Sequence, residues 1–206
     1  MMISFGIFTL HLCLAGSSLA KIHHLFVGNL NLPASIHTLE FDDQTLTLVN
    51  TRKTTADSSH AWIAFDHKKE NIYGASLTVK RISSYSIQPN FTLRLDESLP
   101  ATGACFNKTS AFILPSSHPP HFVYSGSWGG PDGCGMAIST HENGTLSNVT
   151  QSWKYVSESA IHGLIFGLGD KILYSADLSA DKIWIHARKG VGTEPLEKRS
   201  YIIEKV

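Results

Sequence analysis

The stretch Phe122-Val-Tyr-Ser-Gly-Ser-Trp128 decides the fold, because similar stretches recur along the chain. An earlier copy reads Asn71-Ile-Tyr-Gly-Ala-Ser-Leu77, and a later one reads Ile172-Leu-Tyr-Ser-Ala-Asp-Leu178. A weaker copy, Leu25-Phe-Val-Gly-Asn-Leu30, lies closer to the N-terminus. The tyrosine returns about every 50 residues, the period of one four-stranded propeller blade, at Tyr73, Tyr124 and Tyr174. The recurrence therefore predicts a β-propeller.

The segments between these copies also have the character of strands. Short runs rich in Val, Ile, Phe and Thr alternate with turns rich in Gly, Asn, Asp and Pro, which is typical of consecutive antiparallel strands. No run of about twelve residues keeps a helical period, so we expect an all-β chain. We place inner strands at 61–65, 111–114 and 163–166, third strands at 81–87, 135–140 and 182–187, and outer strands at 91–96, 146–155 and 196–203.

These strands sort into units at about 21–55, 56–98, 104–156 and 160–206. The first unit starts directly with a copy of the repeated strand, without an inner strand before it. A closed propeller has at least four blades and commonly more. We therefore expect an incomplete ring of about three and a half four-stranded blades with open edges. Open sheet edges favour pairing with another chain, so self-association is also expected.

The charge of the chain is balanced, with 17 basic and 17 acidic residues, and 42% of the residues are hydrophobic. This composition fits a globular protein and argues against nucleic-acid and anionic-membrane partners, which require a dense basic surface. The Cys and His residues show no zinc-site spacing, and the motif His-Glu-x-x-His is absent. We expect neither a metal nor a cofactor.

The N-terminus and the sequons indicate secretion. An apolar run, Ile3 to Gly16, is followed by Ser-Ser-Leu-Ala, which resembles a signal peptide (residues 1–20) cleaved after Ala20. The alternative is a buried N-terminal strand. Four Asn-x-Ser/Thr sequons, which are acceptors for N-glycans in secreted proteins, lie at Asn90, Asn107, Asn143 and Asn148.

Two cysteines remain in the predicted mature chain, since Cys13 belongs to the signal sequence. Cys105 precedes an inner strand, and Cys134 lies in the loop after a repeated strand. Loops of these two classes emerge on the same face of a four-stranded meander. In an oxidising compartment we therefore expect one disulfide between them.

Histidines supply the candidate site residues. His162 lies on the loop that enters the inner strand at 163–166 and therefore faces the channel mouth, where a neutral imidazole could act as a general acid or base. His60 occupies nearly the same place two units earlier, displaced by one residue, and is a candidate for substrate binding together with His24 at the rim. The alternative for each is a structural histidine. We expect Asp177 and Asp181 to cap a turn and the three repeated tyrosines to pack between blades.

Three parts of the chain carry a resemblance to a known family. They are His23-His-Leu-Phe-Val-Gly28, the stretch Phe65 to Ala75, and Ile161-His-Gly-Leu-Ile-Phe166 with the following Leu173-Tyr-Ser-Ala-Asp-Leu178. Together they resemble the fungal carboxy-cis,cis-muconate cyclase family, whose members are seven-bladed lactonase-type propellers related to 6-phosphogluconolactonase. The resemblance spans about residues 21 to 190 and corresponds to the N-terminal half of such a ring.

The resemblance implies an isomerase of the muconate cycloisomerase type, an intramolecular lyase that needs no metal. A carboxylate of 3-carboxy-cis,cis-muconate adds across a conjugated double bond and forms a lactone, so the expected partner is a small anionic carboxylate or lactone. The catalytic histidine of the family falls at His162, and its arginine and glutamate partners come from later blades. Two alternatives stay open, which are a secreted non-catalytic binding protein and a secreted lactone hydrolase.

Overall fold

A computed structural model describes residues 21–128, 132–167, 169–188 and 197–200 of the chain. The first sheet has three strands, β1 (Ile22–Gly28), β2 (Ser35–Asp42) and β3 (Thr47–Thr55). Three four-stranded sheets follow. The second sheet contains β4 (His60–Phe65), β5 (Asn71–Ser76), β6 (Arg81–Ile87) and β7 (Leu93–Pro100). The third contains β8 (Ser110–Pro115), β9 (Phe122–Ser127), β10 (Cys134–Thr140) and β11 (Leu146–Lys154). The fourth contains β12 (Ile161–Gly167), β13 (Ile172–Asp177), β14 (Lys182–Ala187) and β15 (Glu197–Ser200).

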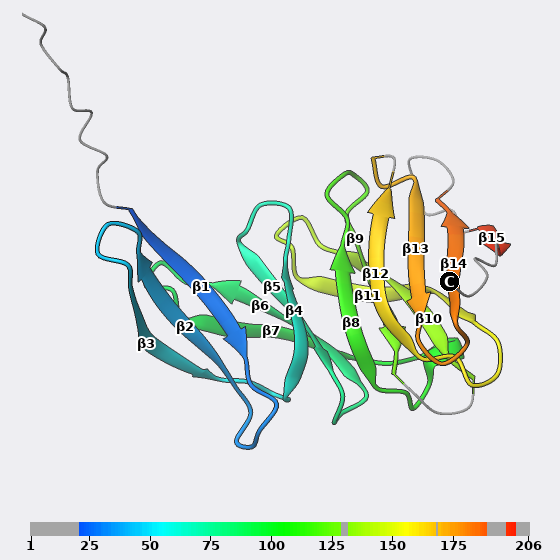
Figure 1. The fold of residues 1–206 in the computed structure, drawn as a ribbon, viewed down its shortest axis with the longest axis horizontal. Helices are drawn as coiled ribbons and strands as arrows, with labels where there is room; N and C mark the ends of the chain where they lie inside the picture. Colours follow the sequence, from blue (N-terminus) through cyan, green and yellow to red (C-terminus); the bar gives the residue numbers. More distant parts are fainter. Residues whose placement is uncertain (1–20, 129–131, 168, 189–196, 201–206) are drawn as a thin grey trace, which may run out of the picture.

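Every sheet is an antiparallel meander in which each strand pairs with its neighbour in sequence. Figure 1 shows the sheets following one another in chain order, with the inner strands β4, β8 and β12 side by side. The described sheets form an open arc of blades. The prediction of an all-β, propeller-like chain of about three and a half blades is therefore confirmed.

The observed bounds of one outer strand differ from the predicted bounds for a local structural reason. The outer strand predicted at 91–96 begins only at Leu93, because Phe91 has a positive φ of 60° and closes a turn by donating its N–H to the carbonyl of Gln88. Of the outer strand predicted at 196–203, the described part is Glu197–Ser200. The predicted signal peptide at 1–20 lies outside the described residues.

The apolar core lies between successive sheets, so each blade is stabilised by its neighbour. Tyr73 of β5 donates a 2.6 Å hydrogen bond to the carbonyl of Gly144 in the next sheet, and Tyr124 of β9 packs edge-on against Phe166 of β12. These contacts confirm the predicted role of the two tyrosines in blade packing. Burial also holds the pKa of the Tyr73 hydroxyl above its ordinary value.

Two faces of the arc matter for function. We call the face where β4, β8 and β12 begin the upstream face, and the face where they end the downstream face. The upstream face carries the loops that lead into the inner strands, together with η1 (Gly103–Cys105). Within the described ranges no helix is long and apolar enough to cross a membrane.

Candidate functional site on the upstream face

His162 lies on the upstream face, at a β-bulge in the inner strand β12. Ile161 pairs with Asp177 and Gly163 pairs with Ala176, so His162 has no partner on β13. Its side chain is exposed, although both residues that precede it are buried. A bulge bends its strand and re-aims one side chain. The local backbone thus presents this imidazole to solvent near the start of β12, directly after two buried residues.

The same bulge recurs in the other inner strands. In β4 the register shifts between His60 and Trp62, around Ala61, and in β8 it shifts between Ser110 and Phe112, around Ala111. The bulged residue is therefore Ala61, Ala111 or His162, depending on the blade. The bulge recurs in all three inner strands, whereas only β12 has a histidine at the bulged position.

The surroundings of His162 come from two sheets. The indole of Trp128, which directly follows β9, lies with its ring centroid 5.2 Å from that of His162. On the other side, His162 shares a shallow depression of about 350 Å³ with Leu178, Asp181 and Lys182. The depression thus offers a titratable imidazole, one ammonium and an adjacent aromatic surface. These groups could hold a small carboxylate and move a proton, the two tasks of an acid–base site.

Asp177 also lines this depression, but its carboxylate is engaged within the fold. It accepts hydrogen bonds from the backbone N–H groups of Ala160 and Ala180 and from Nε1 of Trp184 at 2.9 Å. Burial alone would raise the pKa of Asp177, but the hydrogen bonds that it accepts outweigh burial and hold the pKa below its ordinary value. The predicted turn-capping role of Asp177 is confirmed.

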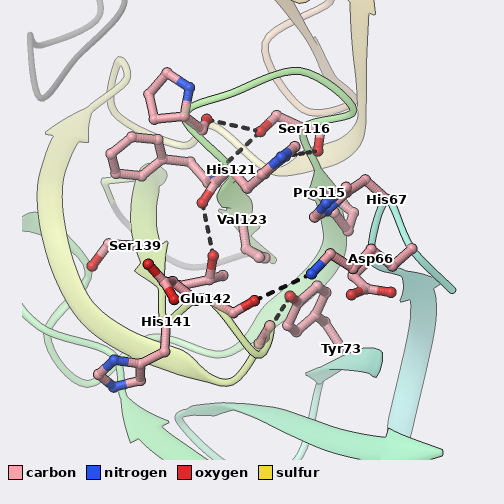
Figure 2. A pocket seen from close by; sticks show the side chains of 15 residues that line it. Asp66, His67, Tyr73, Pro115, Ser116, His121, Val123, Ser139, His141 and Glu142 are labelled. Atoms are coloured by element: carbon pink, nitrogen blue, oxygen red, sulfur yellow. Dashed lines mark hydrogen bonds between the residues drawn. The ribbon is translucent and has the colours of Figure 1, made fainter. Parts of the chain in front are cut away.

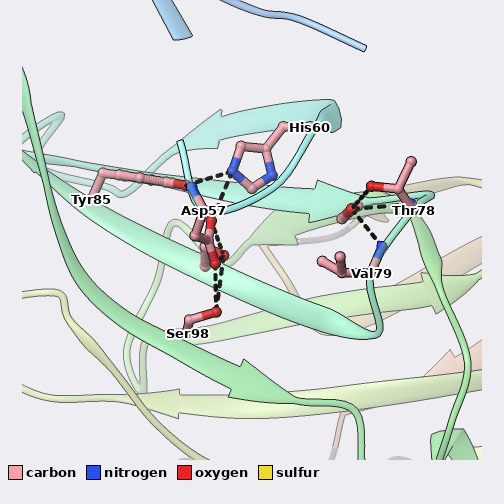
Figure 3. Close-up of polar contacts among 8 residues, drawn as sticks. Asp57, His60, Thr78, Val79, Tyr85 and Ser98 are labelled. Carbon is pink, nitrogen blue, oxygen red and sulfur yellow. Dashed lines mark hydrogen bonds and ion pairs between the residues drawn. The ribbon is translucent and has the colours of Figure 1, made fainter. Parts of the chain in front are cut away.

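The structure does not place the His60 side chain at the channel mouth, where it was predicted to lie. Its side chain is only 2% exposed, and its Nε2 lies 2.7 Å from the hydroxyl of Tyr85 and 3.5 Å from Oδ1 of Asp57. Figure 3 shows these groups gathered in one polar cluster inside the second sheet. His60 is therefore part of the folded interior, and its ring is not presented to a substrate at the channel mouth.

The reason for this difference is the one-residue offset between the two histidines. His60 pairs with Ser76, as Ile161 pairs with Asp177, so its equivalent in β12 is Ile161 and not His162. Both residues pack against a glycine of the preceding blade, where an added Cβ would lie 2.7 Å from the His60 carbonyl at Gly28 or 2.5 Å from the Ile161 side chain at Gly126. At the position before the bulge, the backbone of His60 and the side chain of Ile161 lie at the contact between blades, and the His60 ring lies over Gly74 of its own sheet.

The cluster around His60 contains functional groups that sequence reasoning missed. Asp57 accepts a 2.5 Å hydrogen bond from Tyr85 and further bonds from Ser83 and Ser98. Burial would raise the pKa of Asp57, but these hydrogen bonds and that of His60 outweigh burial and lower it strongly. The hydrogen bonds of this cluster connect the loop before β4 to strands β6 and β7. The spacing Asp57-x-x-His60 was the one signal for it in the sequence.

His24, the other predicted substrate-binding residue, lies in the middle of β1. Its ring stacks on Phe91 of the second sheet at a centroid distance of 3.4 Å, and its Nε2 lies 3.3 Å from Oε1 of Glu40. The structure thus places His24 at a contact between two sheets and away from the depression around His162. These three predicted histidines are not brought together in one site.

Cys105 and Cys134 are joined in a disulfide with a Cα–Cα distance of 5.4 Å, which lies in the usual range for such bonds. Cys105 ends η1 and Cys134 begins β10, and both are buried. The bond ties the loop before β8 to the upstream end of the same sheet. The asparagines of the four sequons are all exposed, at Asn90, Asn107, Asn143 and Asn148.

Comparison with known proteins agrees with this architecture. No family model matches the chain. The carboxy-cis,cis-muconate cyclase of Neurospora crassa is 34% identical over 179 residues, a match that covers 83% of this chain and 48% of the cyclase. The chain therefore spans about half the length of the curated relative it matches.

Two solved structures that share this arrangement are described as lactonases. A candidate 6-phosphogluconolactonase from Bacteroides fragilis has a TM-score of 0.75 at 14% identity, over 89% of this chain and 55% of its own. The periplasmic gluconolactonase of Pseudomonas aeruginosa has a TM-score of 0.68 at 18% identity, over 81% of this chain and 50% of its own. The solved structures share the fold, and the identity with the Neurospora crassa protein shows that this chain belongs to the carboxy-cis,cis-muconate cyclase family.

Proposed function

We propose that the upstream face carries part of a lactonising site of the carboxy-cis,cis-muconate cyclase type, in which His162 is the proton donor. The observation that carries the proposal is the exposed imidazole at the bulge of β12, in a chain 34% identical to that cyclase over 179 residues. The substrate class is a small anionic carboxylate, and the product is the corresponding lactone.

The chemistry needs one proton and no oxidant. A carboxylate oxygen of the substrate bonds to one carbon of a conjugated double bond, and the electron pair of that bond moves to the neighbouring carbon. His162 delivers a proton to this second carbon, so the product is an isomer of the substrate. A positioned acid of this kind contributes about 10² to 10⁴-fold to the rate.

The depression around His162 supplies only part of what such a substrate requires. Among the residues that line it, Lys182 is the single basic side chain besides the histidine, whereas a substrate with several carboxylates needs several cations to stabilise charge as it shifts. We therefore expect the 206-residue chain alone to show no measurable cyclase activity. A form completed with further blades should be active.

The direct test is to incubate the protein with 3-carboxy-cis,cis-muconate and to follow the lactone by NMR. The form to use is a chimera in which this chain is joined to the unmatched part of the Neurospora crassa cyclase. Lactone formation by the chimera supports the proposal. A chimera that folds but converts only a preformed lactone would instead establish a lactone hydrolase, and one that binds substrate without turnover would establish a binding protein.

We also propose that the protein is secreted and N-glycosylated. The apolar run before Ala20, the exposed sequon asparagines and the bond between Cys105 and Cys134 support this proposal, because disulfides persist in oxidising compartments. The test is the intact mass of the natural protein before and after enzymatic removal of N-glycans. A chain that begins after Ala20 and loses mass on treatment is expected. An unmodified chain that still carries residues 1–20 would contradict the proposal.

A further inference from the structure

A cavity lies on the downstream face of the arc, opposite His162. It holds about 500 Å³ between the second and third sheets. Three turns build it, which are those between β4 and β5, between β8 and β9, and between β10 and β11. Figure 2 shows side chains from these turns converging around one space. No group assigned to the proposed lactonising site contributes to it.

Two imidazoles form one wall of this cavity. His67 follows β4 and His121 precedes β9, and their rings stack with centroids 3.5 Å apart and an angle of 6° between the planes. Burial lowers the pKa of His67, and the neighbouring charge of His121 lowers it further. Two stacked imidazolium rings repel each other, so the doubly protonated pair needs a nearby anion to be stable.

The other polar groups of the cavity leave an excess of basic side chains. Lys68 and His141 line it together with the stacked pair. Asp66 also lines it, but its carboxylate already accepts hydrogen bonds from the backbone N–H groups of Glu70 and Asn71 and from Nδ2 of Asn71. Glu142 is exposed to solvent.

The floor of the cavity is apolar and held in place by the fold. Pro115, Pro120, Phe122 and Val123 contribute to the lining. The turn between β8 and β9 is closed by Ser116, which accepts a 2.9 Å hydrogen bond from the N–H of Phe122 and donates its own N–H to the carbonyl of Phe122 at 2.8 Å. A preformed apolar floor with a few polar groups on one wall is the usual design of a small-molecule site.

We propose that this cavity binds a small planar carboxylate, whose charged end contacts the His67–His121 pair and Lys68 and whose planar body lies on the apolar floor. Binding is coupled to protonation of the histidine pair, because the carboxylate relieves the repulsion between the two charged rings. The ligand in turn favours the protonated pair, since such coupling is reciprocal.

The expected pH dependence follows from the groups that face the pair. From the turn after β4 these are Asp66, Lys68 and Glu70, and from the turn after β10 they are His141 and Glu142. On the turn before β9, His118 contacts Asp170, and Arg188 donates a hydrogen bond to the carbonyl of Pro120. Among these types of side chain, histidine is the one with an ordinary pKa between about 5 and 8. Carboxylate binding should therefore strengthen as the pH falls through that range.

The test is saturation-transfer NMR on the full chain with benzoate as the probe. We expect a Kd on the order of 1 mM near pH 5.5, and binding about tenfold weaker near pH 7.5. Benzylamine, which has a similar shape and the opposite charge, should not bind. The same measurement is made on His67→Gln and His121→Gln, each checked for folding by circular dichroism.

Both variants should lose benzoate binding near pH 5.5. The control is His23→Gln, which alters a half-exposed histidine that contacts Asp43 and Phe41 in the first sheet and should leave binding unchanged. Absence of benzoate binding by the wild-type chain, preferential binding of benzylamine, or equal binding by folded His67→Gln and the wild type would each overturn the proposal. Because His67 and His121 lie on the face opposite His162, loss of benzoate binding in their variants is independent of any lactonising activity.

Discussion

His162 lies one position further into β12 than His60 lies into β4, and this offset gives the two imidazoles opposite environments. His60 is 2% exposed and bonded to Tyr85, whereas His162 stands on the bulge and is open to solvent. One residue changes the face of a strand, because side chains alternate along it. Each inner strand thus has two neighbouring positions with different roles. The first, at His60 or Ile161, contributes to the contact between blades, and the second, at His162, is exposed and can act on a substrate.

The contact between the second and third sheets should depend on the hydroxyl of Tyr73. Replacing Tyr73 by Phe removes the 2.6 Å hydrogen bond to the carbonyl of Gly144 and leaves that buried carbonyl without its donor. We expect the free energy of unfolding to fall by about 1–3 kcal/mol, measured by urea denaturation. The control is Tyr124→Phe, since Tyr124 contacts the next sheet through its ring. Equal losses in the two variants would argue against a specific role for the Tyr73 hydroxyl.

Asp57 should make stability depend on pH in the acid range. Its pKa is lower in the folded chain than the ordinary value near 3.9, so its contribution is complete above that value and is lost as the pH falls toward the folded-state pKa. The free energy of unfolding of the wild type should therefore exceed that of Asp57→Asn near pH 6, and the difference should shrink as the pH drops below about 4.

The matched control is Asp181→Asn, which alters an exposed aspartate of the turn before β14. Its difference from the wild type should stay small and nearly constant over the same pH range. A difference for Asp57→Asn that grows as the pH falls would show that the hydrogen bonds of Ser83, Tyr85 and Ser98 do not favour the ionised carboxylate.

The disulfide should be a major contributor to stability. Cys105 and Cys134 are separated by 29 positions, and closing a loop of that size restricts the unfolded chain by on the order of 3 kcal/mol. We expect the double variant Cys105→Ala/Cys134→Ala to lose about that much, measured by denaturation beside the wild type in its oxidised and reduced forms. If reduction of the wild type leaves its stability unchanged, the bond does not contribute as the structure indicates.

The exposed inner strands should make the 206-residue chain self-associate. Trp62 is 47% exposed, Phe65 41% and Ile165 64%, all on strands that would line the channel of a complete ring. Apolar surface of this kind favours association. Sedimentation should show oligomers for the wild type and a shift toward monomer for Phe65→Lys/Ile165→Lys. Leu46→Lys, at a leucine that is 76% exposed in the turn between β2 and β3, serves as control, and a monomeric wild type would contradict the prediction.

The sequence predicted the sheets because the tyrosine repeat sets both their period and their register. It could not predict that His60 is buried, because a one-residue bulge decides whether a histidine at this end of a strand faces the interior or the solvent. Both orientations are compatible with the same strand sequence. The stacked pair His67–His121 was also missed. The two residues lie in turns of different sheets, and only the packing of those sheets brings their rings to 3.5 Å.

The role of His162 is tested by the rate of lactone formation from 3-carboxy-cis,cis-muconate, measured for the ring-complete chimera and for its His162→Ala variant. We predict that the variant folds, still binds the substrate and loses about 10² to 10⁴-fold in turnover. His23→Gln, in the first sheet, should retain the rate of the unmodified chimera. If the His162→Ala chimera keeps that rate, then the exposed imidazole at the β12 bulge is not the proton donor.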